Sequence, residues 1–306
     1  MNALIKEIPR WVYWYPFRMV ADKVPLPMTY PLVKLTAQVG LYIPQRKFPR
    51  MYDGLRKSFP EFNNKDLRSV AYNTFQNYLL NASETFWYPK LNKKRMLKLV
   101  DFEGLEHIDQ ALKLGKGVIL AHAHFGNEEL LMPAIGYMGY TAHQLASRWE
   151  PEEYKGSLAG LVNYIRQKAF QKRIGYRESF PVNFHYVDKG IRPAVRCLQE
   201  NEILLFAVDG REGTKWMKVD FLGREAAFSP GLVTIAKLTG AVILPVFIVR
   251  QPDCRHRLKV HPPIQFNPED EYAVLLEFVK ILEGYIRKNP EQYSKVFFLV
   301  QDFFLN

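Results

Sequence analysis

The sequence predicts an α/β fold with a mostly parallel central sheet flanked by helices, preceded by a helical N-terminal region. From residue 117 onward, short apolar runs alternate with stretches whose apolar residues recur at helical spacing. Strands that alternate with helices usually form a parallel sheet whose faces the helices cover. With 306 residues, 48% of them apolar, the chain can bury a substantial core. We expect residues 1–100 to be the helical region and residues 101–306 the α/β core.

The individual elements follow from local patterns. Residues 64–88 carry apolar side chains every three or four positions, with Asn63 or Asn64 as the N-cap, and predict an amphipathic helix. Residues 229–240 begin with Ser before Pro and end at Gly, which are helix start and stop signals. The remaining expected strands cover residues 117–121, 141–147, 182–187, 203–209, 242–249 and 257–264. The remaining expected helices begin near 127 or cover 153–172, 190–200 and 270–288.

Residues 1–50 combine basic and aromatic side chains. They contain eight Lys and Arg residues against two acids, in a chain of net charge +11, together with eight Trp, Tyr and Phe residues. Trp and Tyr rings suit the lipid headgroup layer, and cations are attracted to anionic lipid. Charges and prolines interrupt the segment long before the roughly 20 apolar residues that a transmembrane helix needs. We therefore expect peripheral or shallowly inserted attachment to an anionic membrane surface.

This composition has other interpretations. The segment could instead be an aromatic-rich subdomain that packs on the main core. Single-stranded nucleic acid also attracts basic and aromatic residues, but the chain shows no RNA-recognition signature, zinc-finger spacing or basic repeat, so we expect no nucleic acid partner. The two cysteines, Cys197 and Cys254, offer no disulfide framework, which indicates a reducing compartment. The N-terminus shows no secretory signal pattern.

The stretch AHAHFGNEEL (121–130) holds the strongest candidate site. His124 should emerge just past the carboxyl end of the strand at 117–121, where open α/β sheets bind ligands. Gly126 allows close approach of the backbone, and Asn127 is a good N-cap for the next helix. Glu129 lies in the first helical turn, from which it can reach back to the ring. The spacing is compatible with a histidine base and an orienting carboxylate.

A metal site is the alternative chemistry for this stretch. His122 and His124 would point the same way if the strand continued, as metal ligands can. No Cys or His cluster elsewhere supplies an obvious third ligand, so we expect no metal. His122 still belongs to the apolar strand and is expected to support or pack rather than react.

The motifs continue in a recognisable order. HFGNEE (124–129) is similar to an HFGN-aromatic-Glu/Asp motif, and the sequence resembles the late lipid A acyltransferase family. This family of lauroyl and myristoyl transferases belongs to a lysophospholipid acyltransferase-like superfamily that includes phosphatidylinositol mannoside acyltransferases. The resemblance covers about residues 50–293. Its other segments are GLRKSFPEF (54–62), SR (147–148), KRIG (172–175), ILLFAVDGREG (203–213), DFLGREAAFSPGLVTIAKLTGAVILPVFIVR (220–250) and RKNPEQY (287–293).

The resemblance implies transfer of a fatty acyl chain from an acyl carrier protein or coenzyme A thioester to a hydroxyl of a glycolipid. It implies that His124 deprotonates that hydroxyl, that Glu129 orients His124, and that Asp209 is a second catalytic acid. The substrate-binding residues implied are Arg148 for phosphate, Arg173 and Arg166 as further cations, and Gly126 and Asn127 in the motif loop. Because a thioester is already activated, no metal or other cofactor is implied. The location implied is the cytoplasmic face of the bacterial inner membrane, peripheral or monotopic.

Several positions depart from the family pattern. Glu128 stands where the family usually has an aromatic residue, and Arg211 occupies the place of the second acid in an Asp-x-Asp element. These departures put the acceptor in doubt, so it need not be lipid A. Two other classes stay open: a glycerol-phosphate or lysophosphatidate acyltransferase, and a catalytically silent lipid-binding relative. Backbone amides near Gly126 or at the start of the 229–240 helix are the candidates for stabilising the oxyanion.

Overall fold

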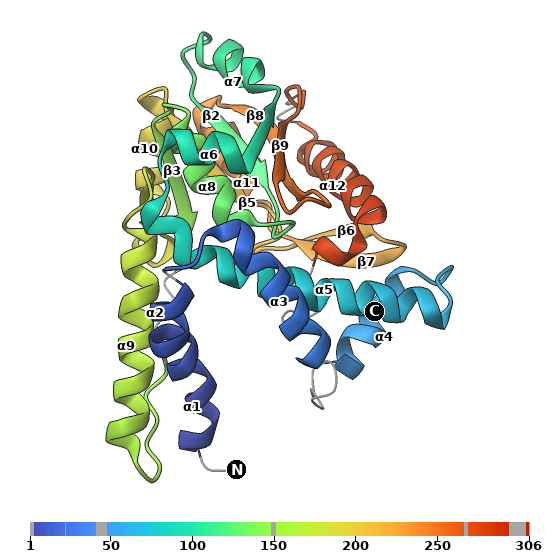
Figure 1. Ribbon diagram of the computed structural model, residues 1–306. Coiled ribbons are helices and arrows are strands. Elements are labelled where there is room, and N and C mark those ends of the chain that lie inside the picture. The colour runs from blue at the N-terminus through green and yellow to red at the C-terminus, as the bar shows by residue number, and fades with distance from the viewer. Residues whose placement is uncertain are drawn as a thin grey trace.

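The computed structural model describes residues 3–21, 23–40, 48–147, 151–265, 269–293 and 304–305. Its centre is a seven-stranded sheet of order β1-β9-β8-β2-β5-β3-β4, in which β8 and β9 are antiparallel and all other neighbours are parallel. The mostly parallel sheet is therefore confirmed (Figure 1). The strands are β1 (Val100–Glu103), β2 (Val118–His122), β3 (Ala142–Ala146), β4 (Asn183–Tyr186), β5 (Ile203–Ala207), β8 (Val242–Arg250) and β9 (His256–Val260).

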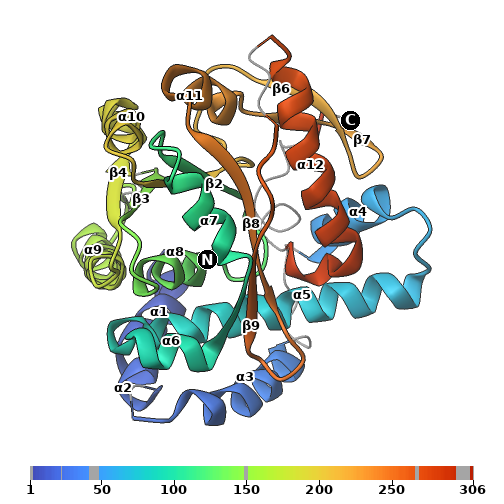
Figure 2. The same ribbon diagram turned by 90° about the horizontal axis from the view of Figure 1, so that it is seen from above.

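Side chains of the central strands pack alternately into two hydrophobic layers, one on each face of the sheet, because successive side chains of a strand point to opposite faces. Ile119 and Ala121 face one layer, whereas Val118 and Leu120 face the other. The first layer is covered by α10 (Arg192–Gln199), α11 (Gly231–Thr239) and α12 (Glu271–Lys288), and the second by α6 (Lys93–Leu99), α7 (Leu105–Leu112) and α8 (Glu128–Tyr137). Figure 2 shows α12 on one side of β8 and α7 and α8 on the other. The helices therefore flank both faces, as the alternating pattern predicts.

The N-terminal region is helical, as predicted. Its helices are α1 (Ala3–Val12), α2 (Arg18–Ala21), α3 (Leu26–Gly40), α4 (Phe48–Ser58) and α5 (Asn64–Glu84), with a π-helical turn at Tyr13–Phe17 and a 3-10 turn at Thr85–Lys90. Asn63 caps α5 in a reciprocal capping box with Asp66, which explains the sharp start of this helix. Met51 and Leu55 of α4 share the first hydrophobic layer with the sheet. Among the described residues, no helix has the length and apolar character needed to span a bilayer.

Helix α9 (Ala159–Arg177) runs beside α1, and both extend away from the sheet in Figure 1. The sequence pattern predicts this helix to begin near residue 153, but it begins at Ala159. The Asn163 side chain hydrogen-bonds both the amide and the carbonyl of Tyr154, which holds the preceding segment outside the helix. The strands predicted from the sequence do not include β1 or the separate hairpin of β6 (Met217–Phe221) and β7 (Arg224–Phe228). These three strands are short and partly polar.

Candidate active site

The register of the sheet brings His124 to Asp209. His122, the last residue of β2, pairs with Ala207, the last residue of β5, so residues two positions further along each strand lie side by side. His124 Nδ1 lies 2.7 Å from Asp209 Oδ1, and the His124 amide donates to both carboxylate oxygens at 3.0 and 3.1 Å. The site stands at the carboxyl ends of parallel strands, as predicted.

A third side chain completes this arrangement from the C-terminal part of the chain. The hydroxyl of Tyr293 donates to Asp209 Oδ2 at 2.9 Å. Tyr293 is fully buried, and burial together with the Asp209 charge raises the pKa of Tyr293 well above its ordinary value, so the hydroxyl keeps its proton. Asp209 therefore accepts hydrogen bonds from an imidazole, a backbone amide and a phenol, which stabilise its carboxylate form.

The two side chains of the pair differ in burial. The Asp209 side chain is 0% exposed and the His124 side chain is 18% exposed. Since Nδ1 faces Asp209, the opposite nitrogen, Nε2, is on the far side of the ring from the carboxylate. A histidine held in this way can take a proton at Nε2 while the carboxylate stabilises the resulting imidazolium.

The neighbouring His122 has a different environment. It is buried, and among the described residues neither of its ring nitrogens has a hydrogen-bond partner. Burial and the nearby His124 lower the pKa of His122 to about 4, so it is neutral at physiological pH. This agrees with the prediction of a supporting rather than reactive His122.

The loop after β2 depends on Gly126. This residue has a φ of +65°, and a Cβ placed on it would clash with the Ile248 carbonyl oxygen, so glycine is required on both counts. Its amide donates to the Gln292 carbonyl at 2.9 Å, and its carbonyl accepts from Asn81 at 2.8 Å. Because the Gly126 amide is engaged inside the protein, this structure does not present it as a donor to an oxyanion.

Asn127 also serves the fold. Its side-chain oxygen caps α8 by accepting from the Leu130 amide at 3.2 Å, which confirms the predicted N-cap. The same oxygen accepts from Tyr88 at 3.1 Å, and the side-chain nitrogen donates to Glu84 at 2.5 Å. All polar atoms of this side chain therefore have partners in the protein, although we predict it among the substrate-binding residues.

Glu129 was expected to orient His124. The acid at His124 Nδ1 is instead Asp209, and Glu129 Oε1 lies 3.4 Å from Arg173 and 3.9 Å from Arg177. The acid at this position is thus 85 residues from His124 in the sequence, because β2 and β5 are neighbours in the sheet. A catalytic role of Glu129 stays a prediction, and the structure places Asp209 for orienting the ring.

The predicted cations have separate positions. Arg173 is on α9 and reaches Glu129, whereas Arg166 donates to Glu7 of α1 and to the Glu152 carbonyl, both at 2.9 Å. Arg166 therefore joins α1 to α9, and the structure gives it a structural contact where we expected substrate binding. Arg148 lies outside the described residues. Within the described ranges, no group of three or more His, Cys, Asp and Glu residues has a metal-binding arrangement.

Sequence reasoning missed Tyr293, Gln292 and Arg177. The first two belong to the PEQY segment already noted for its resemblance, so that motif was the available signal. Arg177 lies four residues after Arg173 on the same face of α9, which is the usual spacing of helical neighbours. Glu84, which contacts Asn127 of this loop, and Arg250, which pairs with Glu84, carried no local signal.

Residues 5–299 match the family model described as bacterial lipid A biosynthesis acyltransferase. The chain belongs to this family. A lipid A biosynthesis acyltransferase of Haemophilus influenzae is 26% identical over 269 residues, covering 85% of this chain and 78% of that protein. A lipid A biosynthesis palmitoleoyltransferase of Escherichia coli is 24% identical over 301 residues, covering 92% and 89%.

A further relative is named for a different acceptor. A phosphatidylinositol mannoside acyltransferase of Mycobacterium tuberculosis is 27% identical over 168 residues, covering 53% of this chain and 48% of that protein. The resemblance noted in the sequence is therefore confirmed for the lipid A acyltransferase family, and the shorter match includes the mannoside acyltransferases. Within this family member, His124, Asp209 and Tyr293 form the candidate active site.

Proposed function

We propose that this protein transfers a fatty acyl chain from a thioester donor, carried by acyl carrier protein or coenzyme A, to a hydroxyl of a lipid A-like glycolipid. The contact between His124 Nδ1 and Asp209 Oδ1 at 2.7 Å carries this proposal, because it supplies an oriented base at the ligand-binding edge of the sheet. The names of the relatives, which are lipid A acyltransferases, support the acceptor class.

The proposed reaction needs one base. His124 Nε2 removes the proton of the acceptor hydroxyl as its oxygen attacks the thioester carbonyl, forming a C–O bond and a tetrahedral oxyanion. Collapse of this intermediate breaks the C–S bond, and the imidazolium returns its proton to the leaving thiolate. Asp209 stabilises the imidazolium through Nδ1, and Tyr293 fixes the far oxygen of Asp209.

Phosphate recognition is assigned to the cations of α9. Arg173 and Arg177 lie on one face of this helix and meet Glu129 in the first turn of α8, five residues after His124. Guanidinium groups bind phosphate well because their donors match its geometry. A phosphate on either substrate would compete with Glu129 for these groups, which gives Glu129 a role in setting their position.

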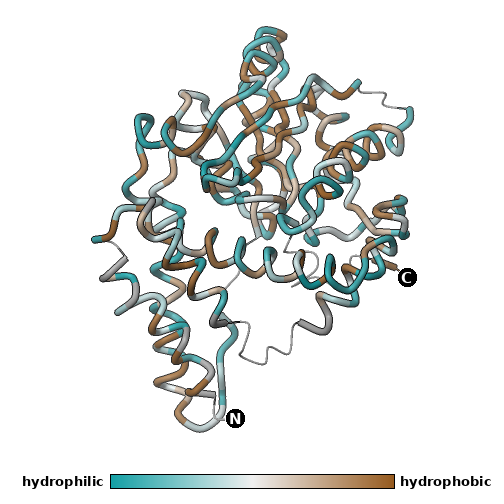
Figure 3. The backbone as a smooth tube through the Cα atoms, turned by 45° about the vertical axis from the view of Figure 1, so that its right-hand side comes forward, coloured by the Kyte–Doolittle hydropathy of each residue, from teal (hydrophilic) through white to brown (hydrophobic). Residues whose placement is uncertain are grey.

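We further propose that the protein attaches to the cytoplasmic face of the bacterial inner membrane through α1 and α3. Helix α3 buries Leu26, Tyr30 and Val33, yet Met28, Leu32 and Leu35 on the other side are more than half exposed. Helix α1 similarly exposes Ile5, Ile8 and Trp11. Figure 3 shows hydrophobic stretches in the helices near the N-terminus. Apolar stripes at helical spacing beside basic residues are typical of helices that lie in a membrane surface.

The transfer reaction is tested directly. The full chain is incubated with labelled acyl carrier protein thioester or acyl coenzyme A and a lipid A precursor, and the products are identified by mass spectrometry. We expect an acylated glycolipid, and His124→Ala should lower the rate by about 100- to 10,000-fold, the range of a lost general base. Asp209→Asn should also lower it, since it removes the charge that stabilises the imidazolium.

The matched control is His107→Ala. His107 is on α7, which follows β1, and β1 is three positions from β2 in the sheet. This variant should keep the wild-type rate. A wild-type rate in His124→Ala would reject the mechanism, and acylation of lysophosphatidate in place of the glycolipid would assign the protein to the other acyltransferase class. An absence of any transfer would favour a lipid-binding relative.

Membrane attachment is tested by flotation with vesicles that contain anionic lipid. Leu32→Glu introduces a charge into the exposed stripe of α3 and should weaken binding. Leu114→Glu is the matched control, because Leu114 is at least as exposed but follows α7 in the core domain. Equal flotation of both variants and the wild type would contradict the proposed surface.

A further inference from the structure

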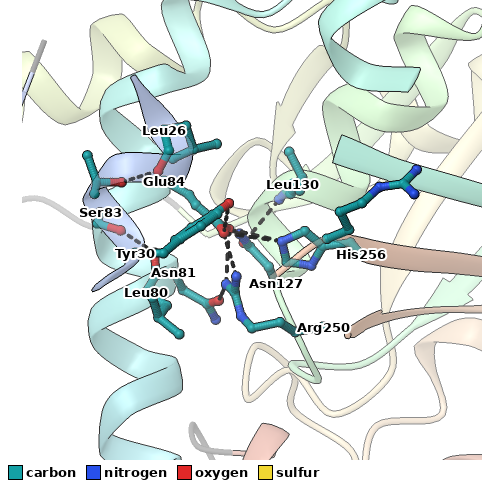
Figure 4. Close-up of polar contacts among 12 residues, drawn as sticks. Leu26, Tyr30, Leu80, Asn81, Ser83, Glu84, Asn127, Leu130, Arg250 and His256 are labelled. Carbon is teal, nitrogen blue, oxygen red and sulfur yellow. Dashed lines mark hydrogen bonds and ion pairs between the residues drawn. The ribbon is translucent and has the colours of Figure 1, made fainter. Parts of the chain in front are cut away.

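A buried polar cluster lies behind the catalytic loop. Glu84, at the end of α5, is 3% exposed and is surrounded by Tyr30, Asn127, Arg250 and His256 (Figure 4). Arg250 Nη1 lies 2.5 Å from Glu84 Oε1, and Arg250 Nη2 lies 3.0 Å from Oε2. A buried charge pair of this kind is costly to form and strongly destabilising to break, so it is not a default feature of a core.

The charges of this cluster are fixed. Burial alone would raise the pKa of Glu84, but Arg250 and His256 lower it below its ordinary value, so Glu84 is ionised. Burial lowers the pKa of His256, which makes it a neutral partner whose Nε2 is 3.2 Å from Glu84 Oε2. The result is one carboxylate paired with one guanidinium, with neutral donors on the remaining sides.

Glu84 and its neighbour Asn81 contact the catalytic loop directly. They lie three residues apart on α5, so both face the same direction. Asn81 donates to the Gly126 carbonyl at 2.8 Å, and Glu84 accepts from the Asn127 side chain at 2.5 Å. Arg250 Nη2 also donates to Asn81 Oδ1 at 2.5 Å, which joins the two contacts.

Arg250 is also connected to the other side of the catalytic loop, through Gln292. The Arg250 amide donates to Gln292 Oε1 at 2.8 Å, and the Gln292 side-chain nitrogen donates to the Arg250 carbonyl at 2.9 Å. The Gln292 carbonyl in turn accepts from the Gly126 amide at 2.9 Å. Both backbone groups of Gly126 are therefore connected to Arg250, one through Asn81 and the other through Gln292.

We propose that Glu84 and Arg250 are positioning residues for His124, acting through the Gly126–Asn127 turn that they hold from both sides. None of their described contacts is to His124 or Asp209, so they set the location of the ring rather than take part in proton transfer. This inference rests on the proposed acyl transfer, in which a displacement of about 1 Å at the reacting groups can cost about 100-fold in rate.

The test exchanges the amide of Asn127 and the carboxylate of Glu84, which hydrogen-bond to each other. Asn127→Asp keeps a good N-cap but sets a second carboxylate against Glu84, and Glu84→Gln leaves Arg250 without its anion. Each variant should lower kcat by about 10- to 100-fold with little change in KM. In the double variant, the new amide at position 84 can donate to the new carboxylate at position 127. The charge of the cluster is then restored, so kcat should recover at least about tenfold relative to either single variant.

A control and a second variant keep the test decisive. Glu202→Gln removes the charge from the group that lies 2.6 Å from His143 at the amino edge of the sheet, away from His124, and should lower the melting temperature without changing kcat. If Glu84→Gln does not fold, Asn127→Ser removes the donor to Glu84 while retaining an N-cap and adding no charge. A wild-type kcat in folded Asn127→Ser and Asn127→Asp would overturn the proposal.

A readout that does not depend on acyl transfer separates this inference from the proposed function. Diethyl pyrocarbonate modifies accessible neutral imidazoles, and its rate at His124 is measured by peptide mass spectrometry relative to His107. We expect this relative rate to change severalfold in Asn127→Ser and to be unchanged in Glu202→Gln. If the wild type transfers no acyl group, the proposed function fails while this rate still decides the positioning role, and an unchanged rate in Asn127→Ser rejects it.

Discussion

Gly126→Ala should be among the most damaging small substitutions in this protein. A methyl group there meets two penalties, the φ of +65° and the clash with the Ile248 carbonyl oxygen. The backbone penalty is about 1–2 kcal/mol, and relieving such overpacking costs about 1–3 kcal/mol more. Moving the loop to escape the clash also strains its hydrogen bonds to Asn81 and Gln292. We expect a loss of about 2–5 kcal/mol in the free energy of unfolding.

Gly115→Ala isolates the first of these penalties. Gly115 has a φ of +70°, but a Cβ there meets no atom within 4 Å. The two variants should therefore differ by the cost of the clash, about 1–3 kcal/mol, which is a difference of roughly 2–12 °C in melting temperature for a domain of this size. Thermal unfolding followed by circular dichroism measures this difference.

Catalysis should separate the two alanine variants more widely. A shift of the loop by about 1 Å in Gly126→Ala should lower kcat by about 100-fold, whereas Gly115→Ala lies before β2 at the other edge of the sheet and should keep the wild-type kcat. Equal melting temperatures and equal kcat values in both variants would refute the requirement for glycine at residue 126.

Three further substitutions test the site. Tyr293→Phe removes one hydrogen-bond donor from Asp209. Because a hydrogen bond to a charged group contributes about 1.5–3 kcal/mol, kcat should fall about 10- to 100-fold in steady-state kinetics. An unchanged kcat would exclude a role for the hydroxyl. His122→Gln tests the buried imidazole. In the unfolded chain His122 is protonated below about pH 6.5, whereas in the folded chain it stays neutral down to about pH 4. The free energy of unfolding of the wild type should therefore fall by up to about 3 kcal/mol as the pH falls through this window. Denaturant unfolding at pH 7 and pH 4 should show a smaller loss in the variant, and identical losses would contradict the depressed pKa. Glu129→Gln should lower kcat far less than Asp209→Asn does, and the reverse order would restore Glu129 as the orienting acid.

Much of the fold follows from the order of apolar runs in the sequence. The runs that became β2, β5 and β8 are almost entirely apolar because helices bury both faces of those strands. Helices α5, α8 and α11 begin close to the predicted positions, because the sequence signals for a helix start are local. The β6–β7 hairpin was missed because its alternating, partly polar strands resemble the loops around them.

The position of His124 was predictable from the sequence, but its acidic partner was not, because that partner depends on the order of the strands in the sheet. His124 could be placed from local sequence, because the end of an apolar strand and the cap at Asn127 bracket it. The choice between Glu129 and Asp209 could not be made in this way, since it depends on β5 lying next to β2 in a particular register. The buried contacts of Glu84 were still harder to predict from the sequence, because a glutamate near the end of a helix is normally solvated.

The wide spacing of these contacts along the chain also sets the order in which the site can form during synthesis. His124 leaves the ribosome well before Asp209 and Tyr293 of the candidate active site, and before Arg250 of the polar cluster behind its loop. Helix α3 emerges earlier still, although part of its inner face packs near Cys254. A nascent chain therefore presents apolar N-terminal helices long before it has a working active site. Contact with a lipid surface at this stage would shield those helices from aggregation until the last strands of the core are made.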